Sequence, residues 1–523
     1  MKVLLTTLNS KYIHSNLAVK YLYAQAKEAG LDEYIDISLI EYTINNDYSY
    51  VYGEILRGNY DVVCMSCYIW NIEQTKVLCE ELKQAVPNLK IVLGGPEVSY
   101  ESDIFLRENP WADCIIRGEG EDSFVQLLSE MIKIEASLKN GAESADASCG
   151  ALCLNKVLSL TYRDNENDEI ITTPHAPLKA MNDIVFPYKY LDIEEDKVIY
   201  YESSRGCPYR CSYCMSSIDK TVRALSLEKT KEQLMFFIDR NVKQVKFIDR
   251  TFNFDKQRAL DIWRFLIEND NGITNFHFEI CAETIGPEHL EVIKNAREGL
   301  FQFEIGIQST NPKTLSAIRR STNVSRIAEN VKALLEMKNS HIHVDLIAGL
   351  PFEDFDTFRN SFNDVYTMGA DNLQLGFLKL LKGTNLYKNR ENFDIIYRRR
   401  APYEVISTKF ISSKELARLK MIENVLDLYH NRGGFDKSVS LLIEKSESAF
   451  DFFDSLAEFY YGCGYQHRSH KKEDLYRILN AYGVSVSRDP AEAETIRRAA
   501  EEDLCASMNS EAVKKFMRKG WEI

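Results

Sequence analysis

The feature that most constrains the fold is an alternation of short apolar runs with amphipathic stretches over the first 135 residues. The apolar runs have strand length and β-branched content, and they lie at residues 2–8, 34–40, 61–67, 90–95 and 113–119. Helical patterns fill the intervals, at residues 16–29, 50–57, 71–86, 99–108 and 121–134. This alternation predicts an α/β fold with a doubly wound parallel sheet, whose ligands bind at the carboxyl ends of the strands.

A second alternating series begins near residue 197. Six strand candidates lie at residues 197–203, 243–249, 275–281, 302–308, 341–347 and 372–378, with helical stretches such as 228–240, 256–268 and 325–338 between them. Six such units predict a partial (β/α)6 barrel of the TIM type, in which chemistry occurs on the loops that follow the strands.

These patterns divide the chain into four parts. We predict a ligand-binding, Rossmann-like domain over 1–135, a linker with a hairpin over 136–196, the partial barrel over 197–395 and an all-α domain over 396–523. In the last part, Ser412 and Glu415 form a capping box at the start of one helix. Further helical stretches lie at 437–461, 472–481 and 491–506.

Composition limits the partners and the location. A formal net charge of −14 and a pI near 5.3 argue against a protein that coats nucleic acid or an anionic membrane. No window approaches the roughly 20 apolar residues that a membrane span needs, and the first residues read as a strand and not as a secretion signal. We therefore expect a cytoplasmic protein without a membrane or nucleic-acid partner.

The chain has 12 cysteines, and most lie in apolar stretches, where burial as small hydrophobic residues is expected. Those expected to be buried are Cys64, Cys67, Cys79, Cys114 and Cys505.

Three other cysteines break this pattern. The stretch "CPYRCSYC" places Cys207, Cys211 and Cys214 on one loop, directly after the first barrel strand. Soft thiolates select zinc or iron–sulfur clusters. A structural zinc site needs a fourth Cys or His, and nothing near the loop offers one. Three thiolates on a 4Fe-4S cluster leave one iron free for another ligand, so the spacing favours a cluster.

The motif "CPYRCSYC" resembles the signature of the radical S-adenosylmethionine (SAM) superfamily, whose core is a six-unit barrel. The resemblance implies that the free iron binds SAM. It also implies that an electron, supplied by a donor such as flavodoxin or ferredoxin, cleaves SAM to a 5′-deoxyadenosyl radical.

Several positions match SAM-contacting residues of that superfamily. Tyr213 precedes the third cysteine, where the backbone meets adenine. "FEIGIQSTNPKTLSAIRR" and "HVDLIAGLP" resemble segments of the coproporphyrinogen-dehydrogenase branch. They imply ribose contacts for Gln308 and Asp345, and a SAM carboxylate contact for Arg320, with Arg319 as its alternative. Glu279, in "FEIC", would hold the SAM amino group.

Each of these residues also has a purely structural interpretation. Gln308 could cap a strand, Arg320 could lie on a helix surface, and Glu279 could pair with a barrel cation. Asp249 and Asn253, after the second barrel strand, could order loops near SAM or act only as caps.

The first domain resembles the cobalamin-binding domain of class B radical SAM enzymes. The matching phrases are "SCYIWN", "IVLGGPEVS" and "IIRGEGEDSFVQLL", and the residues that they imply for cobalamin are Ser66, Gly94, Gly95, Gly118 and Gly120. Domains that ligate cobalt carry Asp-x-His-x-x-Gly after the first strand. Here Tyr12 and Leu17 replace the Asp and the Gly around His14, so the usual orientation of the imidazole is missing. We do not expect His14 to ligate cobalt.

Together these features predict a cobalamin-dependent, oxygen-sensitive radical SAM enzyme that methylates an unactivated centre of a small-molecule or peptide substrate. Two alternatives stay open: a non-methylating cyclase of the anaerobic magnesium-protoporphyrin monomethyl ester type, and a non-catalytic cobalamin or iron–sulfur sensor. A transfer-RNA methylthiotransferase would need its own N-terminal cysteines and an RNA-binding domain. Cys463, His467 and His470 lack a fourth ligand, and we do not expect them to bind metal.

Overall fold

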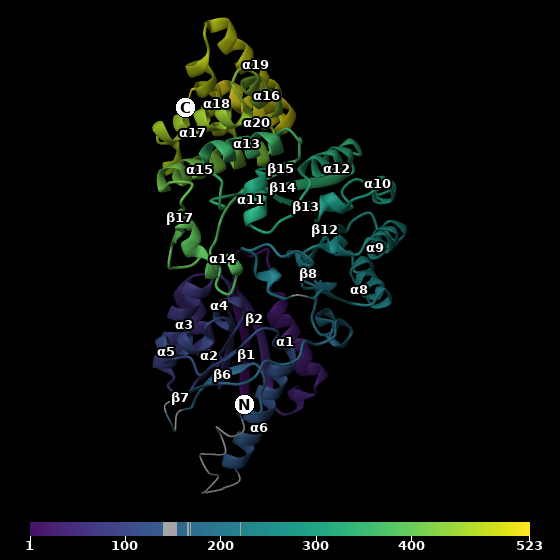
Figure 1. Cartoon of the computed structure of the whole chain (residues 1–523), viewed down its shortest axis with the longest axis vertical. Helices are drawn as coiled ribbons and strands as arrows, with labels where there is room; N and C mark the ends of the chain where they lie inside the picture. Colours follow the sequence, from purple (N-terminus) through teal and green to yellow (C-terminus); the bar gives the residue numbers. More distant parts are fainter. Residues whose placement is uncertain (140–153, 165–166, 168, 220, 523) are drawn as a thin grey trace. The chain divides into compact units, whose positions relative to one another are not determined.

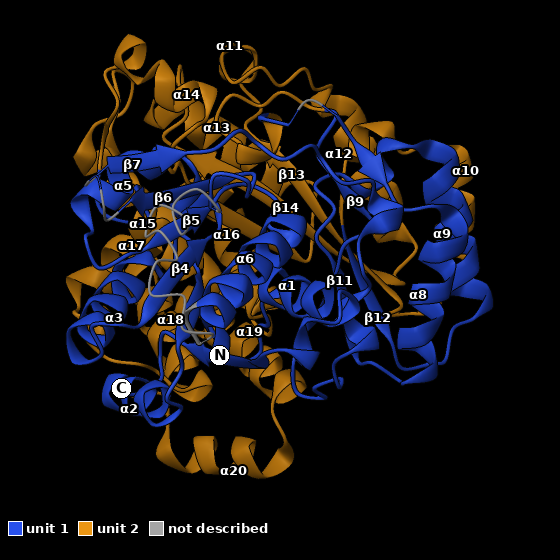
Figure 2. Ribbon diagram, turned by 90° about the horizontal axis from the view of Figure 1, so that it is seen from below, with its two compact units in different colours: residues 1–208, 218–278, 398–403 blue, residues 209–217, 279–397, 404–523 orange. Residues whose placement is uncertain are grey.

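The computed structural model describes residues 1–139, 154–164, 167, 169–219 and 221–522. The chain divides into two compact units (Figure 2). Unit 1 comprises residues 1–208, 218–278 and 398–403, and unit 2 comprises 209–217, 279–397 and 404–523.

Unit 1 contains a seven-stranded sheet in the order β2-β1-β3-β4-β5-β6-β7. Its first five strands are parallel and match the predicted strands within a few residues. They are β1 (Lys2–Asn9), β2 (Asp36–Thr43), β3 (Val62–Ser66), β4 (Lys90–Gly94) and β5 (Cys114–Ile116). The order 2-1-3-4-5 reverses direction between β1 and β3, which makes the carboxyl ends of these two strands a topological switch point.

Helices cover both faces of this sheet, which confirms the doubly wound prediction. One core joins the strands to α2 (Tyr48–Arg57), α3 (Ile72–Ala85) and α5 (Ser102–Glu108), which lie to the left of the sheet in Figure 1. The other core joins them to α1 (Leu17–Glu28) and α6 (Glu121–Lys139).

A hairpin within the predicted linker region extends the sheet. Strands β6 (Leu160–Asp164) and β7 (Glu169–Thr172) pair antiparallel, and β6 pairs antiparallel with β5. The central part of the predicted linker, residues 140–153, lies outside the described residues.

The six barrel strands lie where the sequence predicts them. In unit 1, β8 (Ile199–Tyr201), β11 (Gln244–Phe247) and β12 (Asn275–Ile280) are parallel, with α8 (Leu227–Asp239) and α9 (Lys256–Glu268) between them. The last two residues of β12 belong to unit 2.

In unit 2, β13 (Phe301–Gln308), β14 (Ser340–Ala348) and β15 (Asn372–Phe377) are parallel. The helices between them are α11 (Pro312–Ala317), α12 (Val324–Glu336) and α13 (Phe355–Tyr366). Buried residues alternate along β13 and β14 with half-buried or exposed ones. The side chains opposite the buried face are largely polar, namely Gln302, Glu304, Gln308, His341, His343 and Asp345. Closed barrels instead fill their interior with branched apolar residues, so this face is suited to polar ligands.

The C-terminal part is helical, as predicted. The capping box at Ser412 and Glu415 is present at the start of α15 (Ser413–Leu426). Helices α17 (Ala449–Gly462), α18 (Lys472–Val486), α19 (Pro490–Ser507) and α20 (Ser510–Lys519) follow. The region packs on the barrel helix α13 through aromatic rings, such as Phe362 against Phe450 with centroids 5.4 Å apart.

Three details differ from the sequence prediction. The stretch 437–461 is two helices, α16 (Asp436–Glu444) and α17, because Ser448 caps a new helix with its side chain. A short strand pair, β16 (Ile396–Tyr397) with β17 (Val405–Ser407), precedes α15. Cys505 is exposed on α19, whereas Cys64, Cys67, Cys79 and Cys114 are buried as expected. No helix among the described residues is long and apolar enough to cross a membrane.

Candidate active site

The first half of the cysteine loop is held by a buried carboxylate in unit 1. Asp249 follows β11 and is fully buried, and burial raises the pKa of its carboxyl group. Its two oxygens accept hydrogen bonds from the Ser203 backbone (2.7 Å) and from the hydroxyls of Ser203 (2.6 Å) and Ser204 (2.7 Å). Asp249 therefore orders the segment that leads to Cys207, and the Cys207 thiol lies 3.6 Å from the Thr251 hydroxyl.

An ion network ties the same segment to the sheet. The Arg205 guanidinium, which is only 12% exposed, bridges Glu202 (2.8 Å), Glu121 (2.6 Å) and Glu119 (3.0 Å). Glu119 lies in the loop after β5 and Glu121 is the first residue of α6, both in the phrase that suggested a cobalamin domain. Gly206 follows Arg205 with a φ of 93°, and a Cβ there would lie 1.9 Å from the Thr221 carbonyl oxygen. This close approach requires glycine beside the first cysteine.

The second half of the loop docks within unit 2. The Ser212 amide donates to the Ile318 carbonyl (2.8 Å), and the Ser212 carbonyl accepts from the Leu386 amide (2.7 Å). The Tyr209 hydroxyl donates to the Cys281 sulfur (2.9 Å), directly after β12. Two long-range backbone contacts therefore fix the position of Cys211 and Cys214.

Arg320 lies beside the second cysteine. Its Nη1 is 3.6 Å from the Cys211 sulfur, and its Nη2 donates to the Gly306 carbonyl. Arg319, the alternative, is exposed and has a φ of 56°. A Cβ on Gly306 would lie 2.2 Å from Nε2 of Gln308, so the glycine leaves the space that Gln308 occupies.

Several buried polar atoms around this point lack a protein partner among the described residues. They are Oε1 of Gln308, Nε of Arg320 and Oγ of Ser212. Buried polar atoms are almost always paired in folded proteins. Unpaired donors and an acceptor beside the cysteine loop fit a polar ligand such as SAM, whose hydroxyl and carboxylate groups offer complementary partners.

The other predicted SAM residues lie on neighbouring elements of unit 2. Asp345 is half-buried on β14 and is the register partner of Gly306. Glu279 is half-buried on β12, two residues before Cys281, so the two side chains share one face of the strand. Tyr213 is half-buried in the loop, and burial raises the pKa of its phenol.

Within the described parts of the chain, no three His, Cys, Asp or Glu side chains lie close enough to hold a single metal ion. A 4Fe-4S cluster differs from such a site because each thiolate binds a different iron. All three loop cysteines are free thiols, and Cys207 and Cys214 are partly exposed. The donor set therefore fits a cluster better than a mononuclear centre.

The predicted cobalamin edge lies at the switch point of the first sheet. The Asn71 side chain donates to the carbonyls of Leu8 (3.1 Å) and Ser66 (2.9 Å) and to the Thr7 hydroxyl (3.3 Å). The Trp70 indole also donates to the Leu8 carbonyl (3.2 Å). These bonds hold the loop after β3 against the end of β1.

This edge presents exposed aromatic rings, and its backbone is open at Gly118, whereas a Cβ on Gly95 would lie 2.5 Å from the Cys67 carbonyl oxygen. Tyr68 and Trp70 stack with ring centroids 4.4 Å apart, and Trp70 is exposed, as is Tyr12 after β1. A Cβ built on Gly118 would meet no atom within 4 Å. The other predicted residues lie at the same strand ends, Ser66 at the end of β3, Gly94 and Gly95 at the end of β4, and Gly120 after β5. Exposed aromatic rings beside open backbone fit a large flat ligand.

The structure supplies His14 with a partner that the sequence did not suggest. Nδ1 of His14 lies 2.7 Å from the hydroxyl of Tyr200, on β8. Burial, with Lys11 and Lys246 nearby, lowers the pKa of His14 and favours the neutral imidazole. The phenol can orient the imidazole in place of the missing carboxylate, so the absence of an orienting partner no longer argues against His14.

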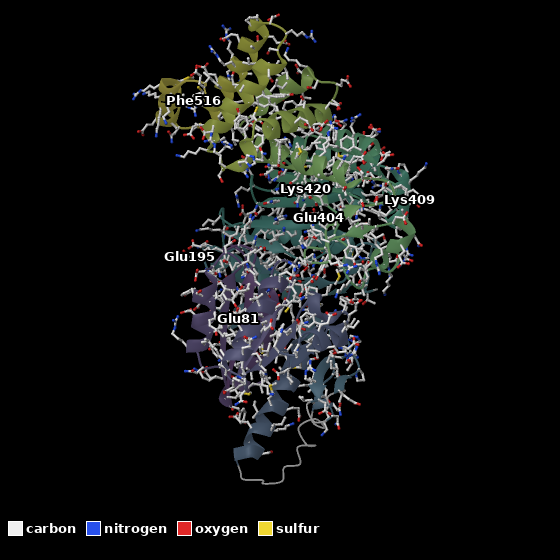
Figure 3. The ribbon with its side chains drawn as sticks, turned by 90° about the vertical axis from the view of Figure 1, so that its left-hand side faces the viewer. Glu81, Glu195, Glu404, Lys409, Lys420 and Phe516 are labelled. Carbon is white, nitrogen blue, oxygen red and sulfur yellow. The ribbon has the colours of Figure 1, made fainter. Side chains whose placement is uncertain are left out.

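Sequence patterns did not identify several residues of unit 2. Glu353 is buried between β14 and α13, and Cys281 contacts the cysteine loop. Lys420, from α15, lies 3.6 Å from the ring centroid of Phe377, the last residue of β15, and 3.2 Å from Glu404 (Figure 3). A C-terminal helix thus contributes a charged side chain at the reactive end of a barrel strand. Local periodicity contains no signal for such contacts.

Farther along the C-terminal region, Cys463 is exposed, and Nε2 of His470 lies 2.7 Å from the Tyr465 carbonyl oxygen. His467 lies in a short 3-10 turn. These residues form no metal-binding group among the described side chains.

Comparison with protein families yields three matches. The B12 binding domain matches residues 3–128, the radical SAM superfamily matches 201–365, and a family described as a protein of unknown function (DUF4080) matches 391–521. The predicted cofactors, a 4Fe-4S cluster, SAM and cobalamin, are those of the first two families.

Individual relatives agree with these matches. An uncharacterized methyltransferase of Pyrococcus horikoshii is 26% identical and covers 58% of this chain and 63% of its own. The cobalamin-dependent radical SAM methyltransferase TokK of Streptomyces tokunonensis is 24% identical over 59% and 45%. An anaerobic magnesium-protoporphyrin IX monomethyl ester cyclase of Cereibacter sphaeroides is 23% identical over 79% and 66%. The chain thus spans about half to two thirds of the length of these relatives.

Two solved structures share the fold. The cobalamin-dependent SAM radical enzyme OxsB has a TM-score of 0.64 and 16% identity, covering 100% of this chain and 84% of its own. The radical SAM methyltransferase TsrM of Kitasatospora setae has a TM-score of 0.62 and 12% identity, over 89% and 99%. Motif, fold and family matches therefore agree: residues 201–365 match the radical SAM superfamily and residues 3–128 match the B12 binding domain.

Proposed function

We propose that the protein is a cobalamin-dependent radical SAM methyltransferase that acts on an unactivated centre of a small-molecule or peptide substrate. The observation that carries the proposal is the cysteine loop beside unpaired polar atoms of Gln308 and Arg320, in a chain that also has a B12-binding domain. The relatives named as methyltransferases support the reaction class.

In this proposal, Cys207, Cys211 and Cys214 hold the cluster. The SAM contacts come from Tyr213, Glu279, Gln308, Arg320 and Asp345. The cobalamin contacts come from Ser66, Gly94, Gly95, Gly118 and Gly120. When bound, the cluster supplies the electron that cleaves SAM, and cobalamin carries the methyl group. The protein's own residues would orient these groups, and the polar face of β13 and β14 would offer SAM hydrogen-bonding partners.

A one-electron donor is required, and a flavodoxin or a ferredoxin fits that role. We further propose that the enzyme is oxygen-sensitive, because an iron–sulfur cluster with an open iron site reacts with oxygen, and that it is cytoplasmic. The charged contact between Lys420 and Glu404 beside Phe377 supports a role for the C-terminal region in selecting the substrate.

The first test is anaerobic purification with analysis of iron and cobalamin, followed by reduction in the presence of SAM. We expect about four irons and one cobalamin per chain, and formation of 5′-deoxyadenosine. A protein that binds both cofactors but never converts SAM would instead be a sensor.

A second test separates methyl transfer from cyclisation. With SAM labelled in its methyl group, a methyltransferase transfers the label to the product. The cyclase alternative rests on the relative from Cereibacter sphaeroides, whose sequence similarity covers 79% of this chain, against 58% and 59% for the methyltransferases of Pyrococcus horikoshii and Streptomyces tokunonensis. A product that lacks the label but has lost hydrogen would support the cyclase and contradict methyl transfer.

A further inference from the structure

We propose that Glu353 is a positioning residue for SAM: its carboxyl group holds the Ser309 hydroxyl and, through it, the left-handed turn that presents Gln308. The inference rests on the proposed function, since Gln308 is a predicted SAM contact. The residues involved all lie in unit 2.

Glu353 is buried (1% exposed) in the turn between β14 and α13. Its Oε1 accepts hydrogen bonds from the hydroxyls of Ser309 (2.5 Å) and Ser361 (2.9 Å). Each hydroxyl in turn accepts from a backbone amide of the turn after β13. The Asn311 amide donates to Ser309 (3.0 Å), and the Thr310 amide donates to Ser361 (3.1 Å). One carboxyl group therefore organises three successive residues, 309–311.

This organisation acts on a strained residue. Gln308 has a φ of 74°, although it is not glycine, and the pairing of β13 with β14 shifts register at the same point. A left-handed conformation is unfavourable for a residue other than glycine and persists only where its surroundings enforce it. Ser309 directly follows Gln308, and its hydrogen bond to Glu353 helps to hold Gln308 in this conformation. A second link, from the Asn311 side chain to the Phe352 carbonyl (2.9 Å), joins the two turns.

The environment of Glu353 favours its uncharged form. No ion pair to Glu353 is found in the described part of the chain, and its Oε2 has no hydrogen-bond partner there. The charged groups around it are acidic. Asp354 is adjacent and caps α13 through the Thr357 amide, and Asp364 of α13 accepts from the Thr310 hydroxyl (2.6 Å). Burial raises the pKa of Glu353 to about 7, because the hydrogen bonds from Ser309 and Ser361, which lower the pKa, only partly counter the effect of burial.

This environment sets the direction of the pH effect. The folded pKa lies above the value of about 4.3 for an unfolded Glu, so the stability that the neutral acid provides is lost as pH rises through about 7. A buried charge without a cation is costly, and opening of the turn relieves that cost. Opening displaces Gln308, so SAM binding should weaken in the same pH range.

The test measures the SAM dissociation constant by equilibrium dialysis, from pH 6 to 8.5, on the anaerobic holoenzyme with its iron content verified. Glu353→Gln keeps the acceptor oxygen and cannot ionise. Because SAM itself titrates, the informative quantity is the ratio of the wild-type constant to that of Glu353→Gln at each pH. We expect a ratio near one at pH 6 that rises at least threefold by pH 8.5. At pH 8.5 this ratio should not exceed about 30, because the ionised-to-neutral ratio of Glu353 grows tenfold per pH unit above the pKa.

Two further variants complete the experiment. Glu353→Ala, which removes the acceptor, should weaken SAM binding at every pH. Asp356→Asn is the matched control, because Asp356 is an exposed acid on α13 that pairs only at the surface with Arg359. It should follow the wild type.

The outcomes separate the two proposals. A ratio that stays flat between wild type and Glu353→Gln overturns the role of Glu353, even where Glu353→Ala fails to fold. A wild-type protein that has a full cluster but binds no SAM at pH 6 contradicts the proposed function itself.

Discussion

At the residue scale, two adjacent arginines have different surroundings. Arg320 contacts the Cys211 sulfur and the Gly306 carbonyl, whereas the side chain of Arg319 is exposed. Replacing Arg320 with Met should therefore weaken SAM binding about 10- to 100-fold, the loss expected for a charge-assisted hydrogen bond of about 1.5–3 kcal/mol. Arg319→Met should change the constant less than about twofold. Equilibrium dialysis on reconstituted protein provides the measurement, with the thermal midpoint as a check on folding. Equal effects of both substitutions would refute this assignment.

The same scale shows where sequence reasoning reaches its limit. Cys207, Cys211 and Cys214 are recognisable because the chemistry depends on their spacing along the chain. The partner of His14 is different, because Tyr200 lies 186 residues away and no pattern links the two. Glu353 also reads from sequence as an ordinary residue before a helix, and only its burial among serine hydroxyls distinguishes it.

At the scale of elements, periodicity predicted nearly every strand and helix that positions the site. Strands β1 to β5 and the six barrel strands have boundaries close to those expected, because buried parallel strands are short apolar runs. The errors have local causes. Side-chain capping by Ser448 splits one predicted helix into two. The hairpin β6–β7 joins the first sheet because β6 pairs with β5. Pairing between distant segments is not encoded in local periodicity.

One inter-element contact leads to a stability prediction. Arg205, just before the cysteine loop, pairs with Glu119 in the loop after β5, with Glu121 at the start of α6 and with Glu202 in its own segment. Arg205→Met leaves these carboxylates without their cation and should lower the free energy of unfolding by about 3–5 kcal/mol at pH 8. Burial already raises the pKa of Glu202, and loss of the cation raises it further. A carboxyl group whose pKa is raised in the folded protein stabilises the fold when it is protonated. The loss in free energy of unfolding caused by Arg205→Met should therefore be smaller at pH 6 than at pH 8.

Urea unfolding of wild type and variant at the two pH values measures this difference. Arg264→Met, at an exposed pair with Asp261, is a suitable control and should cost less than about 1 kcal/mol at both pH values. A deficit for Arg205→Met that grows as pH falls would contradict the role given to the ion network.

At the scale of the whole molecule, the predicted cofactor contacts divide between the units. The residues predicted for cobalamin all lie in unit 1, and the five residues predicted for SAM lie in unit 2. The B12-binding domain has its own two hydrophobic cores, one on each face of its sheet. Its ligand edge is built from β1, β3, β4 and β5, none of which depends on the cysteine loop for pairing.

This division predicts that one cofactor can be lost without the other. A triple variant with Cys207, Cys211 and Cys214 changed to Ala should contain no cluster iron and form no 5′-deoxyadenosine, because its thiolate ligands are absent. It should still bind about one cobalamin per chain, since the switch-point edge is intact. Anaerobic metal analysis and visible absorption of the bound corrin measure the two quantities. The triple variant Cys64, Cys79 and Cys114 to Ser is the matched control, because these buried thiols pack in the sheet cores. This control variant should lose stability and cobalamin binding together. Cluster iron that remains in the Cys207, Cys211 and Cys214 variant would refute the assignment of the loop.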